Sequence, residues 1–240
     1  MNQFDTFKTK IKTLVARHEQ LRVLNRLFVL LKYKFYKVMG SHSQYGEDAI
    51  LAKLLKKKRN GFYIDVGANH PKNLSNTHYF YKRGFRGINI EANPNLIKEF
   101  ELVRKEDINL NIGISNQASE MTFYLSSADT LGSFDLQSVT ESCKIHGAEM
   151  IGEIKVKTEL LKNVIAQYAP DKHIDFMSVD VEGHDLEVLQ SNDWEKYRPE
   201  FLIVETNINT SNLNIYLKEI GYNKVYENHT NSIYRDCRAN

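Results

Sequence analysis

Hydrophobic positions divide the chain into two parts with different periods. Over the first 40 residues, apolar side chains recur every three or four positions, which places most of them on one stripe of a helix. Gly40 ends this pattern. From Phe62 onward, short apolar runs alternate with segments of helical period. We therefore predict an amphipathic helical arm over residues 1–40 and a separate domain over residues 41–240.

The domain alternates predicted strands with predicted helices. The strands cover 62–66, 87–91, 110–115, 121–125, 154–157, 174–181, 201–205, 223–226 and 232–235, and the helices cover 43–55, 76–83, 93–103, 160–168, 185–189 and 212–220. This alternation is typical of an α/β fold with a mostly parallel sheet and helices on both of its faces. The polar stretch 126–152 has no clear period, and we expect a long insertion or substrate loop there.

Composition restricts the class of protein. The 240 residues are 42% hydrophobic and 26% charged, values of a globular chain that exclude a disordered or low-complexity protein. Cys143 and Cys237 lack the spacing of a zinc site or a disulfide framework, which fits a reducing compartment. The longest uncharged run in the arm, 27–31, is far shorter than the ~20 residues that span a bilayer. We expect a cytoplasmic protein.

The formal net charge of +2 is unevenly distributed. Residues 1–40 hold nine Lys or Arg and two acids, whereas residues 41–240 hold 23 basic and 28 acidic residues. A basic amphipathic helix can lie on an anionic membrane surface, dock on a partner helix or fold back on its own domain. The arm therefore predicts a homodimer contact or a peripheral contact with the inner face of the membrane. The acidic domain offers no surface that tracks phosphates, and we expect no nucleic-acid partner.

The turn after the first strand carries the most specific chemistry. Asp65 lies at the strand's end, and Gly67 and Asn69 lie in the turn. A small-residue turn at the carboxyl edge of an open α/β sheet lets the backbone approach a ligand. The third glycine of the dinucleotide fingerprint is missing, which disfavours a pyrophosphate site. The pattern favours a cationic, phosphate-free nucleoside ligand. The alternative is that Asp65 only caps the loop.

Glu91 closes the second strand, 26 residues after Asp65. An acid at this place can accept hydrogen bonds from both hydroxyls of a ribose. Asn93 starts the next helix, and we count it with Glu91 among the candidates that bind the cofactor. The two acids at this separation predict an adenosine ligand.

A second acidic group follows the buried strand 174–181. Asp180 lies at its end, and His184 and Asp185 come after a turn at Gly183. Because the unperturbed pKa of histidine lies near neutrality, His184 can take a proton from a substrate hydroxyl. We expect His184 and Asp180 to act in catalysis, with Asp180 also beside the cofactor. The alternative is that Asp185 caps the helix and His184 lies in solvent.

Glu205 and Asn207 lie at the end of the next strand, at the same edge of the sheet. Together with Asp180 they offer oxygen ligands of the kind that Mg²⁺ prefers. The alternative, which we favour, is that Glu205 and Asn207 line the pocket by hydrogen bonding and that no metal is bound.

In this order, the motifs resemble the FkbM family of S-adenosylmethionine-dependent methyltransferases. The matching stretches are SQYGED at 43–48, YIDVGANHP at 63–71, SNT at 75–77, RGINIEANP at 86–94 and VDVEGHD at 179–185. The resemblance implies a Rossmann-like, seven-stranded methyltransferase sheet with one antiparallel strand near its edge. It also implies O-methylation with S-adenosylmethionine, often of sugars or natural products.

The resemblance assigns roles to individual residues. It puts the glycine-loop role on Asp65, Gly67 and Asn69, the ribose role on Glu91, and the acid-x-Glu-Gly signature on Asp180, Glu182 and Gly183. Gln44 and Asp48 match a motif that is expected near the cofactor. Asp185 stands where a glutamate is more usual, which leaves the helix start intact.

We therefore expect an S-adenosylmethionine-dependent O-methyltransferase that acts on a hydroxyl of a saccharide or glycoconjugate, with a saccharide or glycolipid as acceptor. One alternative is an O-methyltransferase of a small natural product. Another is a module that binds adenosyl ligands without catalysis. An NAD-dependent oxidoreductase is disfavoured by the missing glycine.

Overall fold

The computed structural model describes residues 40–181, 183–206 and 211–239. The predicted helical arm lies outside these residues, apart from Gly40, and so do Glu182 and Asn207. Within the described part of the chain, no helix is long and apolar enough to cross a membrane.

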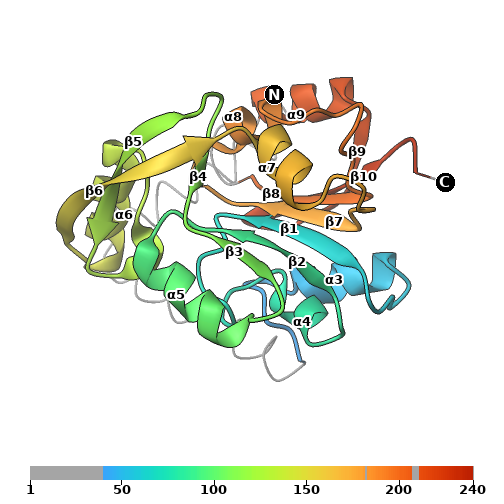
Figure 1. Ribbon diagram of the computed structural model, residues 1–240, viewed down its shortest axis with the longest axis horizontal. Helices are drawn as coiled ribbons and strands as arrows, with labels where there is room; N and C mark the ends of the chain where they lie inside the picture. Colours follow the sequence, from blue (N-terminus) through green and yellow to red (C-terminus); the bar gives the residue numbers. More distant parts are fainter. Residues whose placement is uncertain (1–39, 182, 207–210, 240) are drawn as a thin grey trace, which may run out of the picture.

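A seven-stranded sheet forms the centre of the domain (Figure 1). In spatial order its strands are β3 (Ile108–Leu110), β2 (Arg86–Ile90), β1 (Phe62–Val66), β7 (Phe176–Val179), β8 (Phe201–Glu205), β10 (Asn231–Asp236) and β9 (Tyr222–Glu227). Strands β3 to β8 pair in parallel, whereas β10 is antiparallel to both of its neighbours. This confirms the Rossmann-like, seven-stranded sheet that the family resemblance implied, with its antiparallel strand next to the edge.

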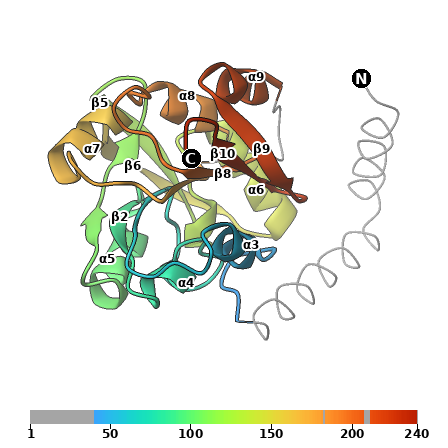
Figure 2. The ribbon, with the colours of Figure 1, turned by 90° about the vertical axis from the view of Figure 1, so that its right-hand side faces the viewer.

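Helices cover both faces of this sheet, as Figures 1 and 2 show. One face carries α3 (Glu47–Leu54), α4 (His78–Tyr81) and α5 (Pro94–Val103), and the other carries α7 (Leu161–Tyr168), α8 (Asp185–Gln190) and α9 (Ser211–Glu219). Because side chains alternate along a strand, Ile64 packs into the core under α7 to α9, whereas Tyr63 packs against α3 and α4. The central strands are therefore buried on both sides.

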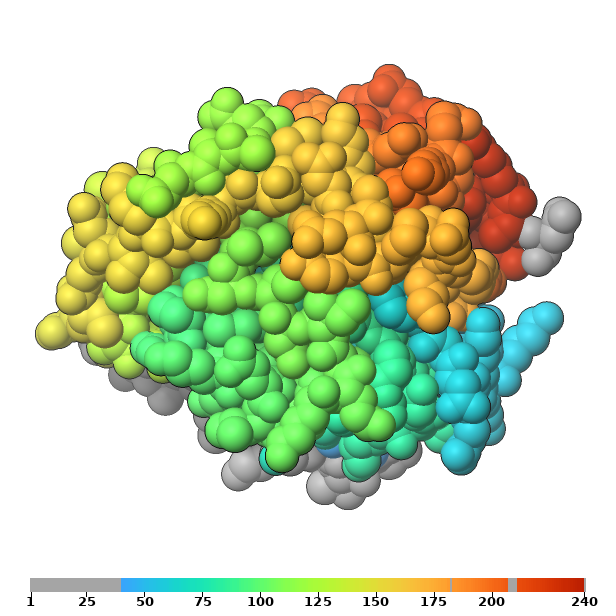
Figure 3. Space-filling view, in the orientation of Figure 1, coloured from blue at the N-terminus to red at the C-terminus, as the bar shows by residue number. Residues whose placement is uncertain are grey.

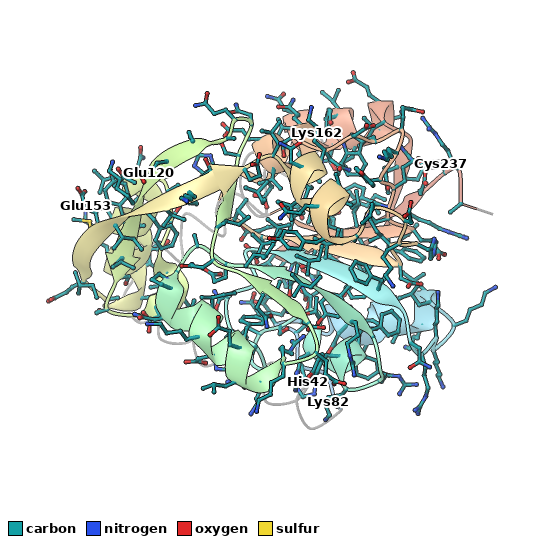
Figure 4. All side chains as sticks on the ribbon, viewed as in Figure 1. His42, Lys82, Glu120, Glu153, Lys162 and Cys237 are labelled. Atoms are coloured by element: carbon teal, nitrogen blue, oxygen red, sulfur yellow. The ribbon has the colours of Figure 1, made fainter. Side chains whose placement is uncertain are left out.

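A smaller sheet forms a lobe at one end of the molecule. It has the order β4 (Gly113–Ile114), β6 (Met150–Glu159), β5 (Ser119–Ser126). The lobe also holds a 3₁₀ turn at Asp129–Leu131 and α6 (Leu136–His146), which lie between β5 and β6. In the space-filling view the lobe projects at the left in green and yellow (Figure 3). Glu120 and Glu153 are exposed on its outer side (Figure 4).

The lobe gives detail to one sequence prediction and corrects another. The stretch 126–152, where we expected a long insertion or substrate loop, contains α6 in its middle. Asp135 caps that helix by accepting hydrogen bonds from the backbone N–H groups of Gln137 and Ser138. Only Val139 and Cys143 of α6 are buried, so its apolar stripe is too sparse to stand out in the sequence.

The predicted strand 110–115 is wrong, because its residues belong to two strands in different sheets. Strand β3 ends at Leu110, and the chain enters the lobe at Gly113. Between them, the Asn111 amide donates to the carbonyl oxygens of Glu91 and Ala92, 2.9 Å from each. These bonds hold the chain as it leaves the main sheet.

Candidate active site

A cavity of about 640 Å³ opens at the carboxyl ends of β1, β2, β7 and β8, between the main sheet and the lobe. It is lined by eight of the residues singled out in the sequence: Gln44, Asp65, Gly67, Asn69, Glu91, Asp180, His184 and Glu205. The carboxyl ends of parallel strands share one edge of a sheet, which is why segments far apart in sequence meet here.

The turn after β1 brings the backbone close to its neighbours. Gly67 has φ 73°, and a Cβ built on it would lie 1.9 Å from the carbonyl oxygen of Asp180. The N–H groups of Gly67 and Ala68 both donate to the carbonyl of Ile90 at 3.0 Å. The turn is therefore fixed against both neighbouring strands, and only glycine fits at its centre.

Glu91 is buried at the end of β2, with 7% of its surface exposed. Its carboxylate accepts hydrogen bonds from the backbone N–H of Asn69, at 2.8 Å, and of Asn93, at 2.7 Å. Burial raises the pKa of Glu91 to about 7, although these backbone donors oppose the shift. The carboxyl group is thus held in one place and retains lone pairs for further donors.

Asn93 has a different place from the one expected. It does not line the cavity; its side chain caps α5 by accepting from the N–H of Asn95 at 3.0 Å. Its amide donates to the carbonyl oxygen of Asp129 at 3.1 Å. Asn93 therefore connects Glu91, α5 and the lobe.

Asp65 is buried at the end of β1. The hydroxyl of Thr77 donates to its Oδ2 at 2.7 Å, and Ser178 is a second hydrogen-bonding partner. Burial raises the pKa of Asp65 to about 6, and Arg104 and both hydroxyls oppose that shift. Asp65 thus both bonds to the loop that follows β1 and lines the cavity, so the alternative that it caps the loop stays open.

The segment before α3 explains the matching motif at 43–48. Asp48 is buried and accepts hydrogen bonds from the hydroxyls of Ser41 and Ser43 and from the backbone N–H groups of His42 and Ala49. Glu47 accepts from the amides of Asn228 and Asn231, at 2.7 and 2.9 Å. The hydrogen bonds of both acids therefore hold the segment around the start of α3 in place, and Gln44 of this segment lines the cavity.

His184 lies immediately before α8, with 31% of its side chain exposed. Its Nδ1 lies 3.5 Å from Oε2 of Glu187. The residue after it, Asp185, accepts from the N–H of Val181 at 3.3 Å, so the departure from glutamate still supports the turn into α8. Glu187 is a carboxylate beside this histidine that the sequence analysis missed.

The cavity is strongly acidic. Its described lining holds two histidines and no Lys or Arg. The carboxylates of the lining are Asp65, Glu91, Asp129, Asp180, Glu187 and Glu205. Such a lining complements a cationic ligand and disfavours an anionic one.

The lobe supplies the other wall of the cavity. This wall includes Phe123, Phe134 and Met121, together with Ile145 and His146 at the end of α6. None of these residues was an individual candidate in the sequence, although we expected an insertion or substrate loop over 126–152. The aromatic residues make this wall more apolar than the strand ends opposite.

The predicted Mg²⁺ ligands stay a prediction. Asp180 and Glu205 both line the cavity, but Asn207 lies outside the described residues. Across the described chain, the group of His, Cys, Asp and Glu spaced to hold a metal is His173, Asp175 and Glu200. It lies at the opposite edge of the sheet, where the Lys58 ammonium already lies 2.5 Å from Oδ1 of Asp175.

Solved structures with similar folds include three methyltransferases. FkbM from Methylobacillus flagellatus has a TM-score of 0.47 at 14% identity, and the match covers 74% of this chain and 43% of that one. A TehB-like SAM-dependent methyltransferase from Corynebacterium glutamicum scores 0.43 at 8% identity, covering 79% and 87%. The 1,6-didemethyltoxoflavin-N1-methyltransferase of Burkholderia thailandensis, with bound 1,6-didemethyltoxoflavin and S-adenosylhomocysteine, scores 0.43 at 11% identity, covering 91% and 89%.

Comparison of the sequence with protein families identifies the family, which the similar structures alone do not. No curated protein matches the chain. This chain spans less than half the length of the Methylobacillus flagellatus protein. The family model described as the methyltransferase FkbM domain matches residues 65–224, which is two thirds of the chain and includes the strand ends around the cavity. The chain belongs to the FkbM family of S-adenosylmethionine-dependent methyltransferases.

Proposed function

We propose that this protein transfers a methyl group from S-adenosylmethionine to a hydroxyl of a saccharide or glycoconjugate. The observation that carries this proposal is the composition of the cavity. Its described lining combines six carboxylates with two histidines and lacks Lys and Arg. Carboxylates suit a sulfonium cofactor, and a histidine suits the removal of a hydroxyl proton.

The cavity residues fit the cofactor. Gly67 lines the cavity, and because it has no Cβ the turn can lie directly against the backbone of Asp180, which presents both strand ends to a ligand. Glu91 can accept from ribose hydroxyls, and Asp65 can accept from the ammonium group of the methionine part. The Oδ1 atom of Asn69 is buried without a hydrogen-bond partner in the described part of the chain, and a ligand donor would satisfy it.

The proposed chemistry assigns one proton to His184. When bound, the cofactor supplies an electrophilic methyl group on a sulfonium. A proton on Nδ1 of His184, directed at Glu187, leaves Nε2 to accept the proton of the acceptor hydroxyl. Asp180 lines the same cavity at the end of β7, where its carboxylate would face the sulfonium. The two walls together would hold the acceptor oxygen in line for attack.

The acceptor class follows from charge and polarity. A phosphate-bearing acceptor would bring negative charge into a lining without Lys or Arg in its described part. Hydroxyl and amide groups of Gln44, Asn76, Thr130 and Ser142 offer hydrogen bonds to a neutral, hydroxyl-rich molecule. A saccharide has this chemistry.

A second candidate function is O-methylation of a small natural product. The apolar wall of Phe123, Phe134 and Met121 favours it, because a saccharide without an apolar part leaves aromatic surface uncovered. An acceptor panel that contains both free sugars and apolar glycosides distinguishes the two functions.

The test begins with calorimetry of S-adenosylmethionine and S-adenosylhomocysteine on the purified chain. Binding of neither would refute the proposal. Binding without turnover over the acceptor panel would support the non-catalytic alternative. With an acceptor in hand, His184→Gln should lower kcat by about 10²-fold or more, because the base is lost while the shape is kept. Near-full turnover of both His184→Gln and His184→Ala would remove His184 from the mechanism.

We also propose that residues 1–40 bring the domain to its acceptor, either through a second copy or through the inner face of a membrane. This proposal rests on the nine Lys and Arg residues and the apolar stripe of the sequence. Flotation of the full chain with anionic and neutral vesicles tests whether it binds a membrane. The mass of the protein in solution tests whether it forms a dimer. A monomer that binds neither vesicle would contradict both.

A further inference from the structure

A buried arginine lies behind Asp65, on the side away from the cavity. Arg104 follows the last turn of α5 and is fully buried. Its Nε donates to the carbonyl of Pro71 at 2.9 Å, and its Nη1 donates to the hydroxyl of Tyr63 at 2.7 Å. The guanidinium carbon also lies 5.0 Å from the ring centre of Tyr81. Burying a charged guanidinium costs free energy, which its hydrogen bonds and a nearby opposite charge must offset.

The remaining contacts of Arg104 lead to Asp65. Its two Nη atoms lie 3.4 and 3.3 Å from the hydroxyl oxygen of Thr77, and Nη2 lies 3.1 Å from that of Ser75. The Thr77 hydroxyl in turn lies 2.7 Å from Oδ2 of Asp65. Arg104 is thus joined to Asp65 through one hydroxyl.

The direction of these bonds is fixed by chemistry. A guanidinium has donors and no acceptor, so Thr77 must accept from Arg104. The single hydroxyl proton of Thr77 is then directed at Asp65. A parallel chain runs from the Asn76 amide, which donates to the Ser178 hydroxyl at 3.1 Å, and Ser178 also hydrogen-bonds to Asp65. Both hydroxyls therefore donate to Asp65, an arrangement that suits a carboxylate and opposes a protonated acid.

The charges around Asp65 leave room for one more cation. Arg104 is also paired with Asp107: its Nη1 lies 3.7 Å from Oδ2 of Asp107, and the side chain of Asp107 is buried as well. Glu91 is another acid nearby, because the charge of Asp65 contributes to its raised pKa, and burial raises the pKa of Tyr63, which keeps that side chain neutral. One guanidinium thus serves two carboxylates on this side of the sheet. A cationic group that enters the cavity could complete the balance, because Asp65 lines it.

We infer that Arg104, acting through the Thr77 hydroxyl, is a positioning residue that keeps Asp65 an oriented carboxylate for the ammonium group of the bound cofactor. This inference rests on the proposed function. It predicts a selective defect. Removing the hydrogen bonds that join Arg104 to Asp65 should weaken the binding of ligands that carry the amino-acid part. The binding of ligands that end at the ribose should change little, because those ligands reach only Glu91.

The test uses Thr77→Val, which keeps the shape of the side chain and removes the hydroxyl. S-adenosylhomocysteine carries the ammonium group and 5′-methylthioadenosine lacks it. We expect Thr77→Val to weaken binding of the first by about tenfold at pH 7, as for loss of a hydrogen bond to a charged group, and to change the second by less than about twofold. Thr77→Ser should restore binding. Thr158→Val is the matched control, because Thr158 is a buried, hydrogen-bonded threonine of the lobe that does not line the cavity.

A second measurement does not depend on any ligand. Carboxyl NMR of the ligand-free protein follows the titration of Asp65, which should move upward by about one pH unit in Thr77→Val and stay in place in Thr158→Val. Equal losses for both ligands, or an unmoved titration, would overturn the inference. If the wild type binds neither ligand, the proposed function fails, and the titration still decides whether Thr77 holds Asp65 ionised. Arg104→Lys, which keeps the charge and loses the fork, should give the same selective defect.

Discussion

Gly67→Ala is the substitution for which the structure gives the sharpest expectation. Gly67 and Gly147 have nearly the same left-handed backbone, with φ 73° and 69°. A Cβ on Gly67 would lie 1.9 Å from the carbonyl oxygen of Asp180, whereas a Cβ on Gly147 would meet nothing within 4 Å. The two alanine variants therefore share the conformational cost and differ in the space available.

The magnitudes can be worked out from these contacts. A left-handed alanine costs about 1 kcal/mol at either position. At Gly67 the ends of β1 and β7 must also separate by about 1 Å, which strains or breaks the bond from the N–H of Asp180 to the carbonyl of Val66 and the two bonds to Ile90. Each is worth about 1 kcal/mol, and overpacking adds about 1–3 kcal/mol. Gly67→Ala should thus be less stable than Gly147→Ala by about 4–6 kcal/mol.

Urea unfolding of both variants and of the wild type, followed by circular dichroism, measures this difference. We expect a small loss for Gly147→Ala and a large one for Gly67→Ala, with unchanged m-values. If the free energies of unfolding of the two variants agreed within about 1 kcal/mol, the close approach between the two strand ends would be wrong. The proposed place of the cofactor at this turn would then lose its geometric basis.

Other expectations concern buried acids. The pKa of Glu91 is raised to about 7, so the folded protein takes up a proton there that the unfolded chain releases near pH 4.5, and stability from this group falls as pH rises between those values. The free energy of unfolding of Glu91→Gln minus that of the wild type should therefore rise by about 3 kcal/mol from pH 4.5 to pH 8, and a constant difference would contradict the burial. Asp48→Ala should cost about 3 kcal/mol in urea unfolding because it leaves buried donors unpaired, against about 1 kcal/mol for the cap residue Asp135→Ala; equal losses would refute the role given to Asp48.

The main sheet and one wall of the cavity could be predicted from the sequence because both follow from local pattern. Short apolar runs separated by helical segments imply parallel strands, and parallel strands place their ends at one edge. Asp65, Glu91 and Asp180 each end such a run, so their convergence needed no knowledge of packing. The resemblance to the FkbM family added the number of strands and the antiparallel strand near the edge.

Arg104 and the lobe could not be predicted in this way. In the sequence, Arg104 is one of several charged residues near a helix end, a place where arginine is usually exposed. Its burial depends on Tyr63, Pro71 and Ser75, which belong to other segments. The lobe likewise depends on long-range pairing of β5 with β6 across 126–152, and α6 buries too few side chains to reveal its period.

The two walls of the cavity divide the proposed reaction between them. S-adenosylmethionine carries a sulfonium and an ammonium group against one carboxylate, so its binding adds one net positive charge to a lining with six acids in its described part. The loaded cavity stays acidic, which disfavours an anionic acceptor and favours a base that becomes a cation when it takes the proton. His184 and His146 are the described lining residues that can do so, and they come from opposite walls. With His184 as the proposed base on the strand-end wall, the lobe wall with His146, Phe123 and Phe134 is where acceptors are distinguished. Substitutions there should change which hydroxyl is methylated while leaving the binding of S-adenosylhomocysteine intact.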